Sequence, residues 1–495
     1  MNVLLITSDE HNKFIVGHQG APRAVTPNLD RLAEEGTRFD SAYTNNPICM
    51  PARATLATGR YGSAIDCFDN GTAYDGVPAS FGHRLRDQDI DTVTFGKLHF
   101  MADADSGFDM RLPLQAKRAY FGAIMGWARG NTPPSNALRT NVEAARPGEF
   151  EYTTYDRYTA QTAAAWLREN ERRSTPWAAH VSFAYPHYPF RVPERYLDPE
   201  GPESFDLPPG WDPDNWVDHP ALNFRRWSQR FDDPPLDAAT LRRQQWIYHG
   251  MVTFVDELVG QVLQALDESS QAEDTLVIYT TDHGDMLGEQ GMFMKGVFYE
   301  GSGGVPMIVR GPGMKAGAIC DTPVSLVDIF PTMIDAAGAE LDDADADLPG
   351  RSLLDIAPEP RDDERLVFAE YHAIGATEAN YMLRQGTLKY TEYLNDETPP
   401  QLFDLGDDPR ETNDLFAERP QEAAHMAAAL RTIIEPEEVN DHILRLQGQW
   451  LEEAGGVAAI ANARTGPKGK LGGYTVPPDE VMAIVGWPDD IDWPS

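Results

Sequence analysis

Two apolar stretches, far apart in the chain, each end in a cluster of acidic residues. Residues 3–7 form an apolar run without polar alternation that leads into the pair Asp9-Glu10, and residues 275–281 lead in the same way into Asp282-His283. Such runs are typical of strands buried on both faces of a parallel sheet. Open α/β sheets bind their ligands at the carboxyl ends of the strands, so we expect the side chains of the two clusters to contribute to a binding site there.

Strands and helices alternate through the first two thirds of the chain. Besides the two runs above, the pattern predicts strands at 92–95, 178–183 and 305–309, and helices at 158–170, 241–266 and 325–337. This alternation predicts an α/β fold with a large, mainly parallel sheet sandwiched by helices. Residues 103–155, which hold many Gly, Pro, Asn and Arg residues, are expected to form a long insertion.

Two acidic, proline-bearing stretches, 342–349 and 358–364, suggest a domain boundary near them. We therefore divide the chain into a large domain, 1–365, and a C-terminal subdomain, 366–495. Short strands expected at 367–371, 381–384, 388–393 and 401–404, with a helix at 419–431, predict a smaller antiparallel sheet plus helix. The tail from 455 to 495 lacks a clear period and is expected to wrap the surface or join a partner subunit.

The sequence Cys49-Met50-Pro51-Ala52-Arg53 leads into a helix expected over residues 52–58. A side chain at a helix N-terminus faces unpaired backbone N–H groups and the positive end of the helix dipole, which favour an anion or a developing oxyanion. Cys49 is therefore a candidate reactive centre, and Arg53, one turn inside, is within reach of it. The simpler alternatives are a small buried thiol at a loop–helix junction and an exposed helix arginine.

Four more candidates stand in short motifs. Lys97 and His99 follow the strand at 92–95, His187 lies in a rigid Pro-His-x-Pro turn after 178–183, and Lys295 interrupts an apolar run. A lysine in apolar surroundings either extends to water or meets an anion. Surface lysines and structural histidines are common, and His249 on the long helix at 241–266 is expected to be one of the latter.

Composition bounds the function. The chain has 495 residues, 41% hydrophobic and 24% charged, and a net charge of −37 argues against nucleic acid and anionic membranes as partners. An anionic substrate is repelled at long range, so its site must gather positive charge locally. No apolar run approaches the roughly 18 to 20 residues that cross a bilayer. Without a leader-like segment and with only three cysteines, we expect a cytoplasmic protein.

Taken together and in this order, the motifs resemble the sulfatase family of the alkaline-phosphatase-like superfamily, over nearly the whole chain. The matching stretches are Asp9-Glu10, Cys49 to Arg53, Gly96-Lys97-Leu98-His99, Pro186-His187, Asp282-His283-Gly284-Asp285, Lys295, Leu402-Phe403-Asp404-Leu405 and Asp408-Pro409-Arg410-Glu411. The resemblance implies hydrolysis of a sulfate monoester, whether aryl, carbohydrate or small alkyl. It also implies that a formylglycine-generating enzyme converts Cys49 to formylglycine.

The resemblance assigns roles to the candidate residues. One divalent metal is expected on Asp9, Glu10, Asp282 and His283 together with the modified Cys49. The residues expected to hold the sulfate and move protons are Arg53, Lys97, His99, His187 and Lys295, with Asn70 as a further candidate.

Three positions depart from the family pattern. Ala52 stands where serine is frequent, Glu10 where aspartate or glutamine is usual, and His283 where many members have asparagine. Ca²⁺ is the metal that we expect first, with Mn²⁺ or Mg²⁺ as alternatives. The imidazole of His283 is the reason to consider Mn²⁺ beside Ca²⁺.

The expected mechanism begins with an aldehyde hydrate at position 49. The metal and Arg53 lower the pKa of one of its hydroxyls, which attacks sulfur while Lys295 or His187 assists the leaving oxygen. His99 then acts as base so that sulfate is expelled.

Two alternatives stay open. A phosphonate monoester or phosphodiester hydrolase uses the same centre, although the related phosphonate hydrolases lack the Lys-x-His pair that Lys97 and His99 supply. A metal-stabilised binding protein with unmodified Cys49 is the non-enzyme alternative. A homo-oligomer is expected in either case.

Overall fold

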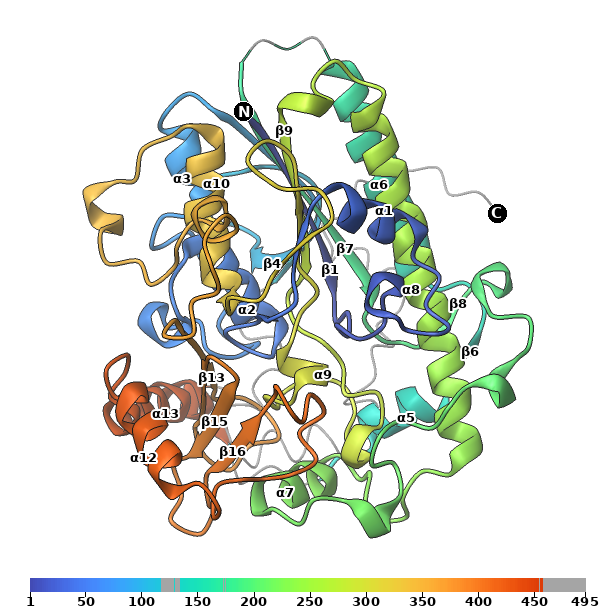
Figure 1. Ribbon diagram of the computed structural model, residues 1–495, viewed down its shortest axis with the longest axis vertical. Coiled ribbons are helices and arrows are strands. Elements are labelled where there is room, and N and C mark those ends of the chain that lie inside the picture. Colours follow the sequence, from blue (N-terminus) through green and yellow to red (C-terminus); the bar gives the residue numbers. More distant parts are fainter. Residues whose placement is uncertain (117–128, 130–133, 172, 174, 454, 457–495) are drawn as a thin grey trace.

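A large sheet is the centre of the molecule (Figure 1). The computed structural model describes residues 1–116, 129, 134–171, 173, 175–453 and 455–456. Eight strands lie in the order β11-β2-β10-β9-β1-β7-β4-β5. Their bounds are β1 (Asn2–Asp9), β2 (Thr37–Phe39), β4 (Asp91–Met101), β5 (Asp109–Ala116), β7 (Trp177–Pro186), β9 (Thr275–Thr281), β10 (Ile308–Arg310) and β11 (Ala318–Cys320). Because only β10 runs antiparallel to its neighbours in this sheet, the predicted mainly parallel architecture is confirmed.

Helices cover both faces of the sheet, as Figure 1 shows. One face packs against α1 (Pro27–Glu35), α6 (Glu151–Glu169) and α8 (Ala238–Asp267), and the other against α2 (Cys49–Thr58), α3 (Phe81–Arg86) and α10 (Ile329–Ala337). In α1, Pro27 occupies the first turn, Leu29 and Leu32 are buried, and Gly36 follows the last residue. The apolar stripe therefore faces the sheet while charged residues face solvent.

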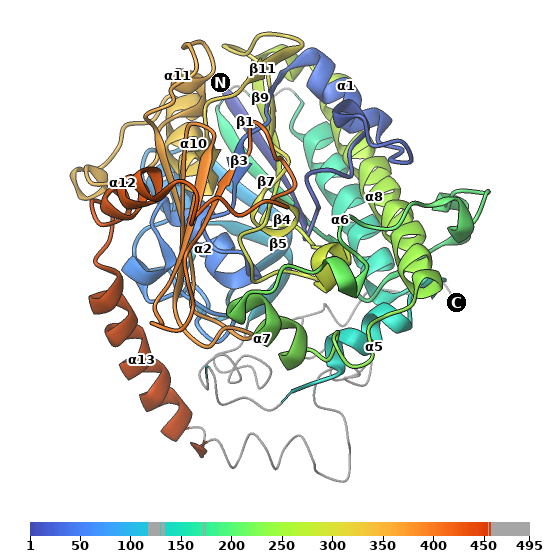
Figure 2. The same ribbon diagram turned by 60° about the horizontal axis from the view of Figure 1, so that its bottom comes forward.

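A second, smaller sheet lies beside the first. It is antiparallel and consists of β13 (Leu366–Tyr371), β14 (Asn380–Gln385), β15 (Leu388–Tyr393) and β16 (Gln401–Asp404). The helix α12 (Pro420–Leu430) packs against it, and α13 (Pro436–Glu453) runs along the outside of the molecule (Figure 2). The predicted antiparallel sheet plus helix is confirmed, whereas the division of the chain into domains at residue 365 stays a prediction.

Shorter strands and helices lie between these elements in the chain. They are β3 (Ala42–Tyr43), β6 (Arg146–Pro147), β8 (Arg191–Val192), β12 (Val324–Ser325), α5 (Ala137–Glu143), α7 (Pro220–Ser228), α9 (Glu300–Gly303) and α11 (Leu353–Ile356). Among the described residues, none of the helices combines the length and the apolar character that a membrane crossing needs.

Several predicted boundaries were wrong. The strand predicted at 92–95 continues to Met101 as β4, so Lys97 and His99 lie inside it rather than after it. A lysine can occupy this buried strand because Asp9 balances its charge. Part of the supposed insertion at 103–155 forms β5 and α5, and α6 begins at Glu151 instead of residue 158. Residues 324–325 pair with β3 as a strand, so the helix predicted from 325 begins at Ile329. Of the predicted tail at 455–495, residues 457–495 lie outside the described part of the chain.

Candidate active site

The two acidic clusters meet because their strands are neighbours. β1 and β9 pair in parallel with Thr7 opposite Thr280, so Asp9 and Asp282 emerge at the same edge of the sheet. The backbone N–H of Glu10 donates to Asp282 Oδ1 at 3.2 Å. This contact crosses the two strand ends and confirms the proximity that the sequence predicted.

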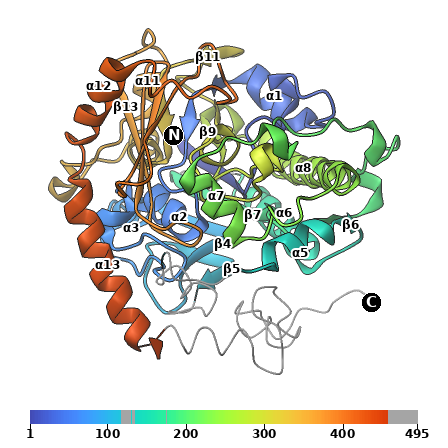
Figure 3. The same ribbon diagram turned by 90° about the horizontal axis from the view of Figure 1, so that it is seen from below.

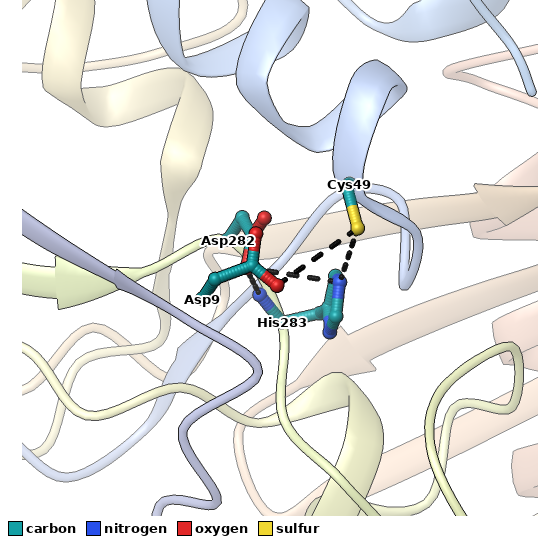
Figure 4. Close-up of side chains that lie close together, drawn as sticks. All are labelled: Asp9, Cys49, Asp282 and His283. Carbon is teal, nitrogen blue, oxygen red and sulfur yellow. Dashed lines mark hydrogen bonds and ion pairs between the residues drawn. The ribbon is translucent and has the colours of Figure 1, made fainter. Parts of the chain in front are cut away.

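Cys49 is the first residue of α2 and lies against this edge (Figure 4). Its Sγ is 3.3 Å from His283 Nε2 and 4.0 Å from Asp9 Oδ1. Burial, together with the charge of Asp9, raises the pKa of the Cys49 thiol to about 12. An unmodified Cys49 is therefore a protonated thiol at neutral pH and a weak nucleophile, since the thiolate is the reactive form.

Arg53 joins the two strand ends. Its Nη2 donates to Asp9 Oδ2 at 2.7 Å and its Nε to Asp282 Oδ2 at 2.8 Å. Burial disfavours the charge, but Asp282 and Asp9 outweigh it and raise the pKa of Arg53 above its usual range. The alternative of an exposed helix arginine is wrong, because the side chain is buried and paired.

Lys97 adds a second cation to Asp9, with Nζ 2.7 Å from Oδ2. Two residues on, His99 adopts a left-handed backbone conformation with φ of 59°. Burial and the charges of Lys97 and Arg53 hold the pKa of His99 well below its usual value, and its Nδ1 has no hydrogen-bond partner in the described part of the chain. His99 is thus a neutral imidazole with a proton-accepting nitrogen to spare.

The last two candidates, Lys295 and His187, both lie against Glu10. Lys295 Nζ is 3.0 Å and His187 Nε2 is 3.4 Å from Glu10 Oε2. Burial raises the pKa of Glu10 to about 8, although the charge of Lys295 opposes the rise. Because His187 Nδ1 lies 2.7 Å from the carbonyl oxygen of Tyr188, which only accepts, Nδ1 carries the proton and Nε2 faces the site.

Donor atoms suited to a divalent cation converge here. One atom from each of Asp9, Cys49, Asp282 and His283 lies within 4.8 Å of the others, and Glu10 belongs to an overlapping group with Asp9 and His187. All five predicted ligands are buried, and Glu10 Oε1 has no hydrogen-bond partner among the described residues. Carboxylate oxygens with one imidazole fit a cation such as Ca²⁺ or Mn²⁺.

Some side chains near the site have structural roles. Asn70 Oδ1 accepts from the backbone N–H of Met50 at 3.0 Å and so caps the first turn of α2. Asp285 Oδ1 accepts from the N–H groups of Leu287 and Met294, which fixes the loop before Lys295. His249 makes no hydrogen bond to the site residues described here. Its Nδ1 lies 2.9 Å from the carbonyl oxygen of Gln245 in its own helix, as expected for a core residue.

Two contributing residues escaped the sequence analysis. Ser182 Oγ accepts from Arg53 Nη1 at 2.9 Å, and Asp156 on α6 accepts from the N–H groups of Ala184 and Tyr185 just before His187. Ser182 and His180 are the polar residues in the strand predicted at 178–183, and a polar residue in such a run is the available signal. Nothing near Asp156 in sequence points to a strand end.

Comparison with known proteins decides the family. The profile of the sulfatase family matches residues 1–339, and that of the C-terminal part of N-sulphoglucosamine sulphohydrolase matches residues 288–438. The protein belongs to the sulfatase family. It is thus a sulfuric ester hydrolase with the alkaline-phosphatase-like fold, and its family implies a metal ion and makes Cys49 the candidate for conversion to formylglycine.

Relatives of this sulfatase include enzymes with different named substrates. A choline-sulfatase of Rhizobium meliloti (strain 1021) is 32% identical over 436 residues, which cover 85% of this chain and 83% of the relative. Arylsulfatase K of Bos taurus is 28% identical over 88% of this chain and 81% of its own. Among solved structures, a phosphonate monoester hydrolase from Silicibacter pomeroyi matches with a TM-score of 0.70 and 25% identity, covering 90% of this chain and 96% of that one.

Proposed function

We propose that this sulfatase hydrolyses small sulfate monoesters through a formylglycine made from Cys49 and one divalent metal. The observation that carries the proposal is the position of Cys49, which begins a helix, is buried, and touches His283 beside Asp9. The thiol itself is unreactive there, so the position makes chemical sense for a modified side chain.

The metal would be held by Asp9, Glu10, Asp282 and His283 with the modified residue 49, and Ca²⁺ is the ion we propose. When bound, the metal and the aldehyde hydrate supply a hydroxyl nucleophile at neutral pH and offset the negative charge of the sulfate. Arg53, Lys97 and Lys295 gather three positive charges at the same place, as the acidic chain requires.

The remaining roles follow from protonation states. Lys295 is buried, which lowers its pKa, but the facing acidic groups, Glu10 and Asp9 among them, outweigh burial and hold that pKa above its usual value, so the charged amine stabilises negative charge on the departing oxygen. Burial and the charges of Lys295 and Lys97 hold the pKa of His187 well below its usual value, so its Nε2, which faces the same region, accepts a hydrogen bond and the proton for that oxygen comes from Lys295. His99 is neutral and accepts a proton, as a general base must.

The relatives guide the choice of first substrates. Choline sulfate and 4-nitrophenyl sulfate correspond to the names of the two relatives above, and both are small monoesters. Choline sulfate carries no net charge, so the acidic surface of the chain does not repel it at long range.

The decisive experiment is mass spectrometry of the peptide across Cys49 after expression with a formylglycine-generating enzyme. We expect the mass of the aldehyde or its hydrate, together with turnover of at least one sulfate ester. The variant Cys49→Ser keeps a hydroxyl but cannot form an aldehyde, and should give at most a single stalled turnover. Unmodified thiol in every preparation, or sustained turnover by Cys49→Ser, would contradict the proposal.

A second candidate is phosphonate monoester hydrolysis by the same centre, because the Silicibacter pomeroyi enzyme has a similar fold over nearly its whole length. Lys97 and His99 favour sulfate. Initial rates on 4-nitrophenyl sulfate and 4-nitrophenyl phenylphosphonate discriminate the two, and a faster phosphonate reaction would reverse the assignment.

We also propose that the enzyme works in the cytoplasm as a homo-oligomer. The free, buried state of Cys49, Cys67 and Cys320 supports a reducing compartment. Light scattering of the purified enzyme measures the oligomeric state, and a monomer would contradict that part of the proposal.

A further inference from the structure

Arg53 makes two hydrogen bonds besides those to the carboxylates. Figure 3 shows α2, which carries Arg53, lying against β4. The Nη1 atom of Arg53 donates to the carbonyl oxygen of Lys97 at 2.5 Å and to Ser182 Oγ at 2.9 Å. With the bonds to Asp9 and Asp282, four of the five N–H groups of the guanidinium are engaged. Within the described part of the chain, one N–H group on Nη2 is left for a ligand, and the other four set its direction.

Two more polar side chains continue from Ser182. Thr7 on β1 lies opposite Ser182 in the register of β1 and β7, and its hydroxyl donates to Ser182 Oγ at 2.9 Å. His180 Nε2 lies 2.9 Å from Thr7 Oγ1. Because the hydroxyl of Thr7 gives its one proton to Ser182, its oxygen accepts the Nε2–H of His180. A chain of hydrogen bonds therefore runs from His180 through Thr7 to Ser182, where it meets the bond from Arg53.

Burial makes this chain rigid. The side chains of Thr7, Ser182, His180 and Arg53 are all buried. Burial and the charge of Arg53 lower the pKa of His180 to about 3, so its ring is neutral and carries a single N–H. Ser182 Oγ accepts from both Arg53 and Thr7, which uses both of its lone pairs. A buried polar group that loses its partner finds no water to replace it, so each member holds the next in one orientation.

We propose that Thr7, Ser182 and His180 are positioning residues of the sulfatase reaction, which act through Arg53 by holding its guanidinium in one orientation at the ends of β1 and β9. The inference rests on the proposed function and adds these residues to its site. None of the three is a catalytic residue, because each acts on the reacting groups only through Arg53.

The kinetic test removes one hydroxyl at a time from the full-length, formylglycine-bearing enzyme. On the sulfate ester that the wild type hydrolyses fastest, Thr7→Val and Ser182→Ala should each lower kcat about 10- to 100-fold, because a small displacement of a catalytic group has an effect of this size. KM should change by less than about threefold, since the lost interaction acts in the transition state. Thr7→Ser keeps the hydroxyl and should retain most of the activity.

Thr94→Val is the matched control. Thr94 on β4 lies opposite His180 in the register of β4 and β7 and is 1% exposed. Its hydroxyl has no hydrogen-bond partner among the residues that the structure describes. The substitution makes the same change of side chain as Thr7→Val in the same part of the sheet, and it should change kcat by less than about threefold.

A double-mutant cycle shows whether the effect passes through Arg53. Lysine has no second nitrogen to donate to Ser182, so the chain has nothing to position in the Arg53→Lys enzyme. In that background Ser182→Ala should lower kcat by less than about threefold, against about 10- to 100-fold in the wild type. A residue that only supports the fold would cause the same loss in both backgrounds.

A second readout needs no turnover. Nitrogen-15 NMR of histidine-labelled, unmodified protein reports which ring nitrogen of a neutral histidine carries the proton. We expect the proton of His180 on Nε2, with its signals assigned from their absence in His180→Gln. Thr7→Val should shift the Nε2 signal, and Thr94→Val should shift it far less. A proton on Nδ1 would break the chain at Thr7 and overturn the inference.

The kinetic outcomes are also distinguishable. Equal losses from Thr7→Val and Thr94→Val overturn the inference, as does an undiminished effect of Ser182→Ala in the Arg53→Lys enzyme. Wild-type kcat in both Thr7→Val and Ser182→Ala overturns it as well. If an enzyme with verified formylglycine hydrolyses no sulfate ester, the proposed function itself fails, whereas the tautomer of His180 tests the hydrogen-bond chain without turnover.

Discussion

At the scale of single residues, Arg53 is the side chain that holds the site together. Its planar guanidinium spans Asp9 and Asp282, which come from different strands. A lysine cannot present two such donors in a fixed fork. We therefore expect Arg53→Lys to lower kcat at least about 100-fold and to destabilise the apo protein by about 3–5 kcal/mol, because one buried carboxylate loses its partner. Steady-state kinetics and urea unfolding measure the two effects, and a variant with wild-type kcat would contradict this role.

Buried histidines make stability fall in acid. Burial lowers the pKa of His249 to about 4, while the unfolded chain titrates near its ordinary value of 6.5. Between these values the unfolded chain binds a proton that the folded protein does not, so stability is complete above pH 6.5 and falls as pH decreases toward 4. One such group contributes about 1.4 kcal/mol per pH unit. Urea unfolding at pH 7, 6 and 5 measures the free energy of unfolding. In His249→Phe this free energy should fall less steeply with decreasing pH than in the wild type, by up to about 1.4 kcal/mol per pH unit. An unchanged slope would contradict the prediction.

At the scale of elements, the sequence predicted the features that depend on local residue patterns. The apolar runs of β1 and β9 fixed where Asp9 and Asp282 emerge, and the residue order around Cys49 predicted its helix. The local pattern does not show that Lys97 lies inside its strand, since a lysine in a buried strand requires an anion from another part of the chain, here Asp9. Such a pairing depends on the register of β1, β7 and β4, which no local pattern shows.

The helix α6 positions the end of β7 through Asp156. Its carboxylate accepts from the N–H groups of Ala184 at 2.8 Å and Tyr185 at 2.8 Å, directly before the turn that carries His187. Asp156→Ala leaves both donors buried and unsatisfied, at about 1–3 kcal/mol each, and frees that turn. We expect kcat to fall about 10- to 100-fold on an activated aryl sulfate while the formylglycine content is unchanged.

The control for this prediction lies on the same helix. Arg157 pairs with Glu149 at the surface, so Arg157→Ala should leave kcat unchanged. Asp156→Asn, which keeps one acceptor, should fall between the wild type and the Ala variant. Full activity in Asp156→Ala would show that the turn is held by other contacts.

At the scale of the whole molecule, a buried ion network joins the two sheets. Lys389 on β15 places Nζ 2.9 Å from Glu300 Oε1 and 2.7 Å from Glu411 Oε1, and Lys13, shortly after β1, places Nζ 2.6 Å from Glu300 Oε2. All four side chains are buried. The segment that carries the ligands of β1 is thereby tied to the C-terminal sheet, so the smaller sheet supports the geometry of the active site.

Removing Lys389 should uncouple the two parts. Lys389→Met leaves Glu411 without its cation, and breaking a buried pair in this way costs about 3–5 kcal/mol. We expect a lower unfolding temperature and faster proteolysis in the C-terminal sheet, measured by calorimetry and limited trypsin digestion.

Neutralising the unpaired carboxylate in Lys389→Met/Glu411→Gln should recover part of the lost stability, because the amide needs no counter-charge. The surface variant Arg361→Ala, which breaks an exposed pair with Asp363, should change stability by less than about 1 kcal/mol. Equal effects of the buried and the exposed variants would mean that the network does not join the sheets.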